Sequence, residues 1–247
     1  MNRQKFLVRT DRLHLVLMLM LTFSTGVVDA VGYLGLDRVF TGNMTGNVVL
    51  LGMAVVGGTG LPVLRPALAL AFFMLGAALA GRVLRRRGEG WTVRTSANFL
   101  AVALGLWALT VFVASAPVHA EQSLGSTTTS AMALVMGIQA ATAKKLKVAE
   151  ITTVVVTSTI TGLAADSRLA GGSGVHWVRR ALAIVLILLG ALTGSAALLV
   201  GLWLGLGLAA VIASVVVAVG HVRYRMDARA ALTEVEEAAG VGAGVGT

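Results

Sequence analysis

The sequence lacks cysteine, has only three prolines and contains few charged residues. Charged side chains make up 13% of its 247 residues, about half of their usual share in a soluble domain. Without cysteine the chain has neither a disulfide framework nor a thiolate metal site. The scarcity of charge also excludes a disordered polar protein, because such chains have too little apolar surface to bury and this one is 57% hydrophobic.

Apolar residues are abundant instead, and they give a mean hydropathy of +0.87. A helix needs about 20 mostly apolar residues to cross a bilayer. Eight apolar segments are present, of which the second and the sixth are the shortest or most polar. They cover residues 13–36, 48–56, 66–84, 97–116, 131–143, 151–165, 181–200 and 201–219. The sequence therefore predicts an all-α, polytopic membrane protein.

The two halves of the chain resemble each other at an offset of 111 to 114 residues. The matching pairs are 26–30 with 137–141, 65–77 with 179–191, and Thr41 and Thr45 with Thr153 and Thr157. Because these matches are collinear, they predict two four-segment repeats, at about 13–116 and 128–221. The recurrence of the first segment also argues against a cleaved signal peptide at the N-terminus.

The positive charges select a topology, because Lys and Arg gather in cytoplasmic loops. If all eight segments crossed the membrane, the twenty basic residues would divide eleven to nine between its two sides. If the second and sixth segments enter and leave on one side, only Arg38 and Arg65 lie opposite the other eighteen. The sequence thus predicts six transmembrane helices plus two re-entrant or broken short helices, with cytoplasmic termini. The same division accounts for the net charge of +9 without a nucleic-acid partner.

Each repeat contains three spans, an odd number, so the second repeat enters the membrane from the opposite side. We therefore expect inverted repeats, an arrangement found in transporters that bind their solute near the membrane midplane. We expect a single transmembrane domain, residues 1–225, and a disordered cytoplasmic tail at 226–247 that ends in a glycine-rich run. Glycine-rich helix surfaces would also permit a homodimer.

Asp29 is the one acidic residue clearly inside a predicted span. A carboxylate in a membrane is costly, which makes it a candidate site for a proton or a cation. Its expected partners are the Asn and Thr groups of the short segment that follows. The alternative interpretation places Asp29 near the outer face, where it would be hydrated or paired with Arg38.

The stretch 41–47 is a duplicated Thr-Gly-Asn around one methionine. At helical spacing its residues would share faces in pairs: Thr41 with Thr45, Gly42 with Gly46, and Asn43 with Asn47. Polar groups persist at membrane depth where they line a wet cavity or are buried in protein. The stretch is therefore either a lining for a solute or ion, or a set of interhelical hydrogen bonds and glycine contacts.

The second half offers weaker candidates for the same lining. Gln139 lies next to Ala140, the counterpart of Asp29, and Thr153 and Thr157 belong to a threonine stripe. For the stripe we favour hydrogen bonds to the helix's own carbonyls or to neighbouring helices. The four histidines show no metal-ligand spacing, and catalytic motifs are missing. We expect no metal, no cofactor and no enzymatic activity.

Four motifs together resemble the YoaK family. They are residues 26–30 (GVVDA), 40–47 (FTGNMTGN), 136–140 (MGIQA) and 152–157 (TTVVVT), and the resemblance extends to about residue 225. It implies a multi-pass protein of the bacterial cytoplasmic (inner) membrane, and it implies no particular substrate. Ser158 and Thr159 depart from the Thr-Gly that the first repeat would predict, so the two short segments are not chemically equivalent.

These observations favour a small-solute transporter or permease, embedded in the lipid bilayer, with a polar site for an unknown solute or ion at the repeat interface. A passive channel filtered by the short segments is an alternative. A third possibility is a membrane scaffold or partner-binding protein, in which the polar residues only hold helices together.

The topology predicts where single cysteines react in this cysteine-free chain. In right-side-out cells, a membrane-impermeant thiol reagent should label Thr59→Cys, because the loop at 59 faces outward. Gly88→Cys and Ser173→Cys should react only after the membrane is permeabilised. Labelling of Gly88→Cys from outside would contradict both the six spans and the inverted repeat.

Overall fold

The computed structural model describes residues 3–243, except 37, 58–59, 86–89, 117, 119–120 and 147–155, with side chains described within 12–233. The described residues form eight α-helices and one 3-10 turn, and no strand. The helices are α1 (Arg3–Gly35), α2 (Met44–Val56), α3 (Leu64–Leu84), α4 (Val93–Ser115), α5 (Gln122–Lys145), α6 (Val156–Ala165), α7 (Trp177–Ala197) and α8 (Leu202–Ala243). The all-α prediction is confirmed, and each predicted apolar segment corresponds to one helix.

Five helices in the described part of the chain are long and apolar enough to cross a membrane: α1, α3, α4, α7 and α8. The short helices α2 and α6 have 13 and 10 residues. Both are much shorter than the roughly 20 residues that a helix needs to span a bilayer. Helix α5 has 24 residues, which is long enough, but Ser and Thr between 123 and 130 lower its hydropathy.

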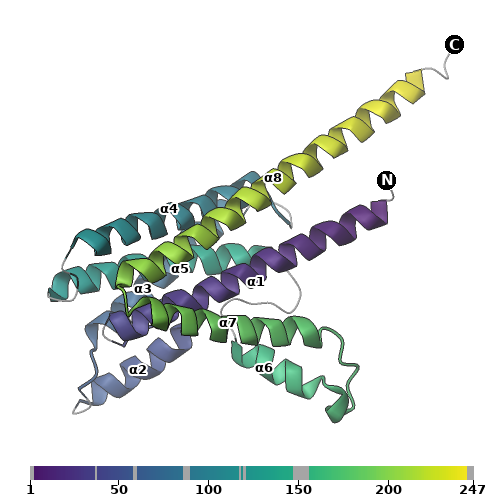
Figure 1. Ribbon diagram of the computed structural model, residues 1–247. Coiled ribbons are helices and arrows are strands. Elements are labelled where there is room, and N and C mark those ends of the chain that lie inside the picture. The colour runs from purple at the N-terminus through teal and green to yellow at the C-terminus, as the bar shows by residue number, and fades with distance from the viewer. Residues whose placement is uncertain are drawn as a thin grey trace.

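The long helices form an elongated bundle in which α1 and α5 are the most enclosed (Figure 1). Helix α1 packs mainly on α7 and α8, and α5 packs mainly on α3 and α4. The short helices cover the outer members of these pairs, α2 on α3 and α6 on α7. Each of these contacts has an equivalent in the other half of the chain. The α1–α7 contact corresponds to α5–α3, α1–α8 to α5–α4, and α2–α3 to α6–α7. The sequence repeat therefore has a matching pattern of helix contacts.

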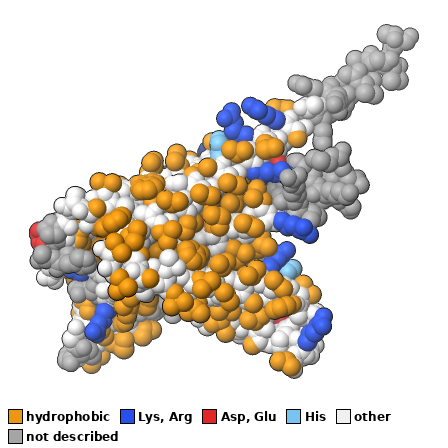
Figure 2. Space-filling model, viewed as in Figure 1, with side chains coloured by type: hydrophobic (Ala, Val, Ile, Leu, Met, Phe, Trp, Pro, Cys, Tyr) orange, Lys and Arg blue, Asp and Glu red, His pale blue; other side chains and the backbone are white. Residues whose placement is uncertain are grey.

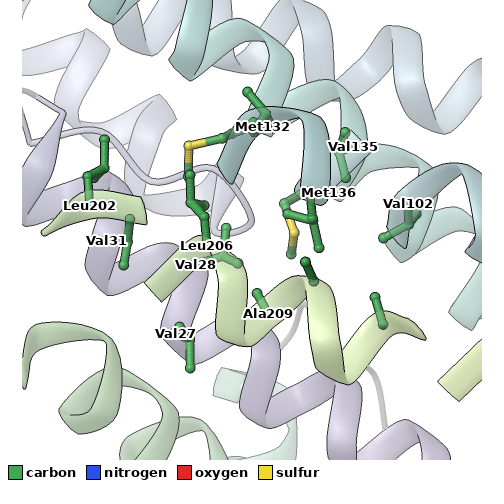
Figure 3. Close-up of a cluster of buried hydrophobic side chains, with 14 of the residues drawn as sticks. Val27, Val28, Val31, Val102, Met132, Val135, Met136, Leu202, Leu206 and Ala209 are labelled. Atoms are coloured by element: carbon green, nitrogen blue, oxygen red, sulfur yellow. The ribbon is translucent and has the colours of Figure 1, made fainter. Parts of the chain in front are cut away.

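The central core lies where α1, α4, α5 and α8 meet (Figure 3). Val27, Val28 and Val31 of α1 and Met132 and Met136 of α5 belong to this cluster. Leu202, Leu206 and Ala209 contribute from α8, and Val102 contributes from α4. These side chains are buried, so this part of the bundle is packed with protein rather than open to a solute.

Two glycine crossings hold helices of opposite repeats together. Gly26 of α1 lies against Gly190 of α7, and a Cβ on Gly26 would collide with the carbonyl of Ile187. Gly137 of α5 and Gly76 of α3 make the equivalent crossing in the other pair. Small residues let helix backbones approach closely, which is how helices associate in membranes. Gly76 and Gly190 thus both serve helix packing.

Hydrophobic side chains cover the middle of the molecule on the face shown in Figure 2. Most of the Lys and Arg visible on that face lie toward the end where α1 and α8 project. A broad apolar surface of this kind would be an aggregation hazard in water but matches lipid. The protein is therefore a membrane protein in contact with the bilayer.

The C-terminal segment differs from its prediction as a disordered tail at 226–247. Helix α8 continues without interruption as far as Ala243. Its sequence there, from Asp227 to Ala239, is rich in Ala and Glu, which are strong helix formers, and its first residues extend a helix that already exists. The composition indicated a polar segment, but it did not exclude helix.

The glycine crossings predict a sharp difference between two glycines of α3. Gly76→Ala would press its methyl group into the backbone of Leu134, whereas Gly81→Ala has no atom within 4 Å of the added Cβ. We expect Gly76→Ala to lose about 1–3 kcal/mol of stability, the usual cost of overpacking. Gly81→Ala should be neutral. Thermal unfolding of the purified protein in detergent checks both, and equal effects would contradict the close crossing.

Candidate functional site

Asp29 holds the start of helix α2. The backbone N–H groups of Thr41, Gly42 and Asn43 donate to its Oδ1 at 3.1, 2.7 and 3.3 Å. Helix α2 begins at the next residue, Met44. A carboxylate at a helix N-terminus is stabilised by the helix dipole and by amide groups that have no partner within the helix. The side chain from α1 therefore fixes where the short helix begins.

The partners of Asp29 lie in the predicted segment, but they are backbone amides rather than Asn and Thr side chains. The alternative ion pair with Arg38 does not occur among the described residues. Arg38 itself is exposed and adopts a left-handed backbone conformation, with φ of 58°. Asp29 is half-buried, and the turn before α2 rather than Arg38 binds its carboxylate.

The second Thr-Gly-Asn positions an aromatic ring. Asn47 is fully buried, donates from Nδ2 to the carbonyl of Phe40 and accepts the N–H of Phe40 at 3.0 Å. Gly46 lies under the Phe40 ring, where a Cβ would come within 2.8 Å of it. The ring stacks on Tyr33 of α1, with centroids 4.7 Å apart. Gly46 and Asn47 therefore serve packing, while the backbone of the first copy binds a carboxylate.

The shared helical faces predicted for 41–47 are wrong, because the helix begins only at Met44. Asn43 is the N-cap of α2, and its exposed side chain accepts the N–H of Gly46, whereas Asn47 is buried. Gly42 packs against Thr25 and Asp29, and not together with Gly46. The prediction assumed continuous helix across residues that form a turn.

A cavity of about 460 Å³ opens beside Asp29. Its walls come from α1, the turn before α2, the first turns of α2 and α6, and α7. The lining residues are Thr25, Asp29, Tyr33, Phe40, Gly42, Asn43, Thr45, Gly46, Val49, Leu50, Val156, Thr157 and Ile187. Asp29 is the one charged side chain among the described residues of this wall. The cavity thus combines one carboxylate with hydroxyl, amide, aromatic and apolar groups.

The cavity brings together both halves of the sequence repeat. Thr45 is the second residue of α2 and Thr157 is the second residue of α6. Both are exposed to the cavity, and they are 112 residues apart. The first turns of both short helices therefore meet at one place. Thr153, the other predicted lining residue of the threonine stripe, lies outside the described residues.

Two more predicted residues lie behind the cavity wall. Gln139 of α5 is buried and donates from Nε2 to Oγ1 of Thr25 at 3.2 Å. Its Oε1 and the Oγ1 of buried Thr41 have no hydrogen-bond partner among the described residues. Buried polar atoms without partners are rare and costly. Gln139 therefore contributes to the site through Thr25, and Thr41 through its backbone.

Three lining residues, Thr25, Tyr33 and Phe40, were not predicted from the sequence. A signal for the first two was present, because Thr25, Asp29 and Tyr33 are spaced i, i+4 and i+8 and so share one face of α1. Phe40 gave no such signal, since its position depends on the hydrogen bonds from Asn47.

Comparison with known proteins places this chain in a wider family. The sequence profile of a family described as protein of unknown function (DUF1275) matches residues 17–219, a range that includes every lining residue. The UPF0700 transmembrane protein YoaK of Bacillus subtilis (strain 168) is 37% identical over 156 residues. That match covers 61% of this chain and 65% of the relative. No solved structure matches the chain. The resemblance to the YoaK family is confirmed.

The contacts of Asn47 predict a stability difference between two polar residues of α2. Asn47→Leu keeps the size of the side chain but leaves the N–H and C=O of Phe40 without partners, at a cost of about 2–4 kcal/mol. Thr45→Val is its control, because Thr45 is exposed and similar in shape to valine. We expect thermal unfolding to show a large loss for Asn47→Leu and little change for Thr45→Val. Equal melting temperatures of the two variants would contradict a stabilising role for the hydrogen bonds between Asn47 and Phe40.

Proposed function

Because the chain belongs to the DUF1275 family, whose description assigns no activity, we propose a function from the site itself: a small-solute transporter of the cytoplasmic membrane. The observation that carries the proposal is the cavity beside Asp29, where the first turns of two short helices from opposite halves of the chain meet. Short helices that end inside the membrane, next to a carboxylate, are typical of solute and ion sites in transporters.

The proposal includes six spans, with α5 as the sixth. Helix α5 packs between α3 and α4, so little of it needs to face lipid. Its buried polar side chains are Thr128, Thr129, Ser130, Gln139 and Thr142. This is why its hydropathy is low. Its counterpart α1 is also largely enclosed and carries buried Thr22, Ser24 and Thr25. Both central helices are therefore enclosed by protein and carry buried polar side chains.

The proposal also includes inverted repeats. The helix pairings repeat between the two halves, and the glycine crossings of the α1–α7 and α3–α5 pairs are equivalent. In Figure 1 the helices α2 and α6 point away from each other from a common centre. Two short helices that enter from opposite sides of a membrane would have this arrangement. With eighteen of the twenty basic residues on one side, the termini are cytoplasmic.

Asp29 links two parts of the molecule that could move relative to each other. It belongs to α1, which is joined to α7, whereas the amides that it binds precede α2, which packs on α3. Hydrogen bonds to a charged carboxylate are about twice as strong as neutral ones. A proton or cation on Asp29 would therefore weaken its hold on the turn at 41–43. Ion occupancy would in this way be coupled to the separation of the α1–α7 and α3–α5 pairs.

This coupling predicts proton movement that depends on Asp29. Vesicles containing the purified protein and a pH-sensitive dye are exposed in turn to amino acids, sugars, organic cations and organic anions. We expect one of these classes to move protons with the wild-type protein. Asp29→Asn should reduce that movement about tenfold or more, because it removes the charge and the titration but keeps the shape. The other titratable lining residue, Tyr33, is unchanged in this variant.

Glu121→Gln is the matched control, since Glu121 is exposed at the start of α5 and away from the cavity. It should behave as the wild type. Solute flux without proton dependence would identify a passive channel. No flux for any solute class, or flux unaffected by both Asp29→Asn and Asn43→Ala, would favour a scaffold and reject the transporter.

A further inference from the structure

The charge of the cavity is set by a single carboxylate. Oδ1 of Asp29 accepts three backbone N–H groups, while Oδ2 accepts no hydrogen bond from the described residues. No Lys, Arg or His is among the described lining residues. A carboxylate oxygen in a membrane protein is costly to leave without a counter-charge or a proton. The open oxygen of Asp29 therefore favours a positively charged partner in the cavity.

An aromatic pair stands beside this carboxylate. Tyr33 lies one helical turn after Asp29 on α1, and its ring stacks on Phe40, also a lining residue. Asn47 and Gly46 hold Phe40 in place, so the pair is built into the site rather than exposed by chance. The faces of aromatic rings attract cations, and aromatic cages bind quaternary ammonium groups in this way.

The remaining wall requires more than a bare metal ion. Val49, Leu50, Val156 and Ile187 give the cavity an apolar side, and its volume is about 460 Å³. Cavities of this size and mixed lining are typical of small organic ligands. An inorganic cation would leave the apolar side unfilled, and it would usually need several oxygen ligands, whereas Asp29 is the one carboxylate present. The occupant should therefore have an apolar body as well as a charge.

We infer that the cavity binds a small organic cation, an ammonium group with an apolar body, held by Asp29 and by the Tyr33–Phe40 pair. This inference rests on the proposed function, because it names the class of solute that the transporter would move. A proton and the ammonium group would compete for Asp29, so the transporter would exchange one for the other. The hydroxyls of Thr25, Thr45 and Thr157 are available to a polar substituent on the solute.

The test uses three probes of one shape that differ in charge. Choline is positive, its carbon analogue 3,3-dimethylbutan-1-ol is neutral, and 3,3-dimethylbutanoate is negative. Binding to the purified full-length protein in lipid nanodiscs is measured by titration calorimetry at neutral pH. We expect choline to bind about tenfold or more tightly than the neutral analogue, and the anion not to bind.

Two variants separate recognition from folding. Asp29→Asn should weaken choline binding about tenfold or more, and Tyr33→Leu should weaken it about 2- to 30-fold, the range of a cation–π contact. Tyr33→Leu leaves the contacts of Asp29 with the turn at 41–43 intact, so it tests the inference even if Asp29→Asn fails to fold. Glu121→Gln should bind like the wild type, and thermal unfolding confirms that each variant is folded.

Dye-loaded vesicles with choline outside then separate the inference from the proposed function. Choline binding with proton exchange supports both. Choline binding without movement keeps the ligand class and rejects transport. Equal or tighter binding of the neutral or anionic analogue overturns the inference, whether or not that analogue is transported, and would indicate that the N-termini of α2 and α6 dominate the field of the cavity. Failure of all three probes to bind also overturns it.

Discussion

The contact between Asp29 and the turn before α2 is the interaction on which the rest of the site depends. The N-terminus of a helix leaves backbone amide groups that have no partner within the helix. The carboxylate of Asp29 accepts three of them, at Thr41, Gly42 and Asn43. In return, the amides stabilise the negative charge of Asp29. The turn before α2 and the half-buried carboxylate of Asp29 therefore stabilise each other.

The duplicated motif divides its work around this contact. The first Thr-Gly-Asn supplies backbone amides, and Gly42 lets the turn approach Asp29 and Thr25 closely. The second supplies the residues that fix Phe40, which in turn meets Tyr33. The two copies look alike in sequence, yet one binds through its backbone and the other through its side chains. One wall of the cavity is thus formed by the segment 40–47 together with Thr25, Asp29 and Tyr33 of α1.

Most of the fold was predictable because it depends on patterns that survive in any context. Long apolar runs become helices in lipid, and the collinear glycines mark the crossings at Gly26 and Gly137. Several residues of the site were predicted from the sequence, but the atoms through which they make contact were not. Asp29 binds backbone where side chains were expected, since residues 41–43 form a turn that Asp29 itself stabilises. When a tertiary contact determines the local backbone, the sequence shows no periodic pattern for it. Phe40 was missed for the same reason, because its position depends on hydrogen bonds with Asn47.

The symmetry of the helices and the asymmetry of the charge have different consequences. Glycine crossings join α1 to α7 and α5 to α3, so each tight pair contains one helix from each half of the chain. Between these pairs the contacts beside the cavity are polar: Asp29 with the turn at 41–43, and Gln139 with Thr25. The position equivalent to Asp29 is Ala140, so on the proposed function one proton or cation is enough to alter that interface. On the proposed function, the repeated helix pairs, α1–α7 and α3–α5, can take two arrangements relative to each other. The ligand or proton bound at Asp29 then determines which arrangement is more stable.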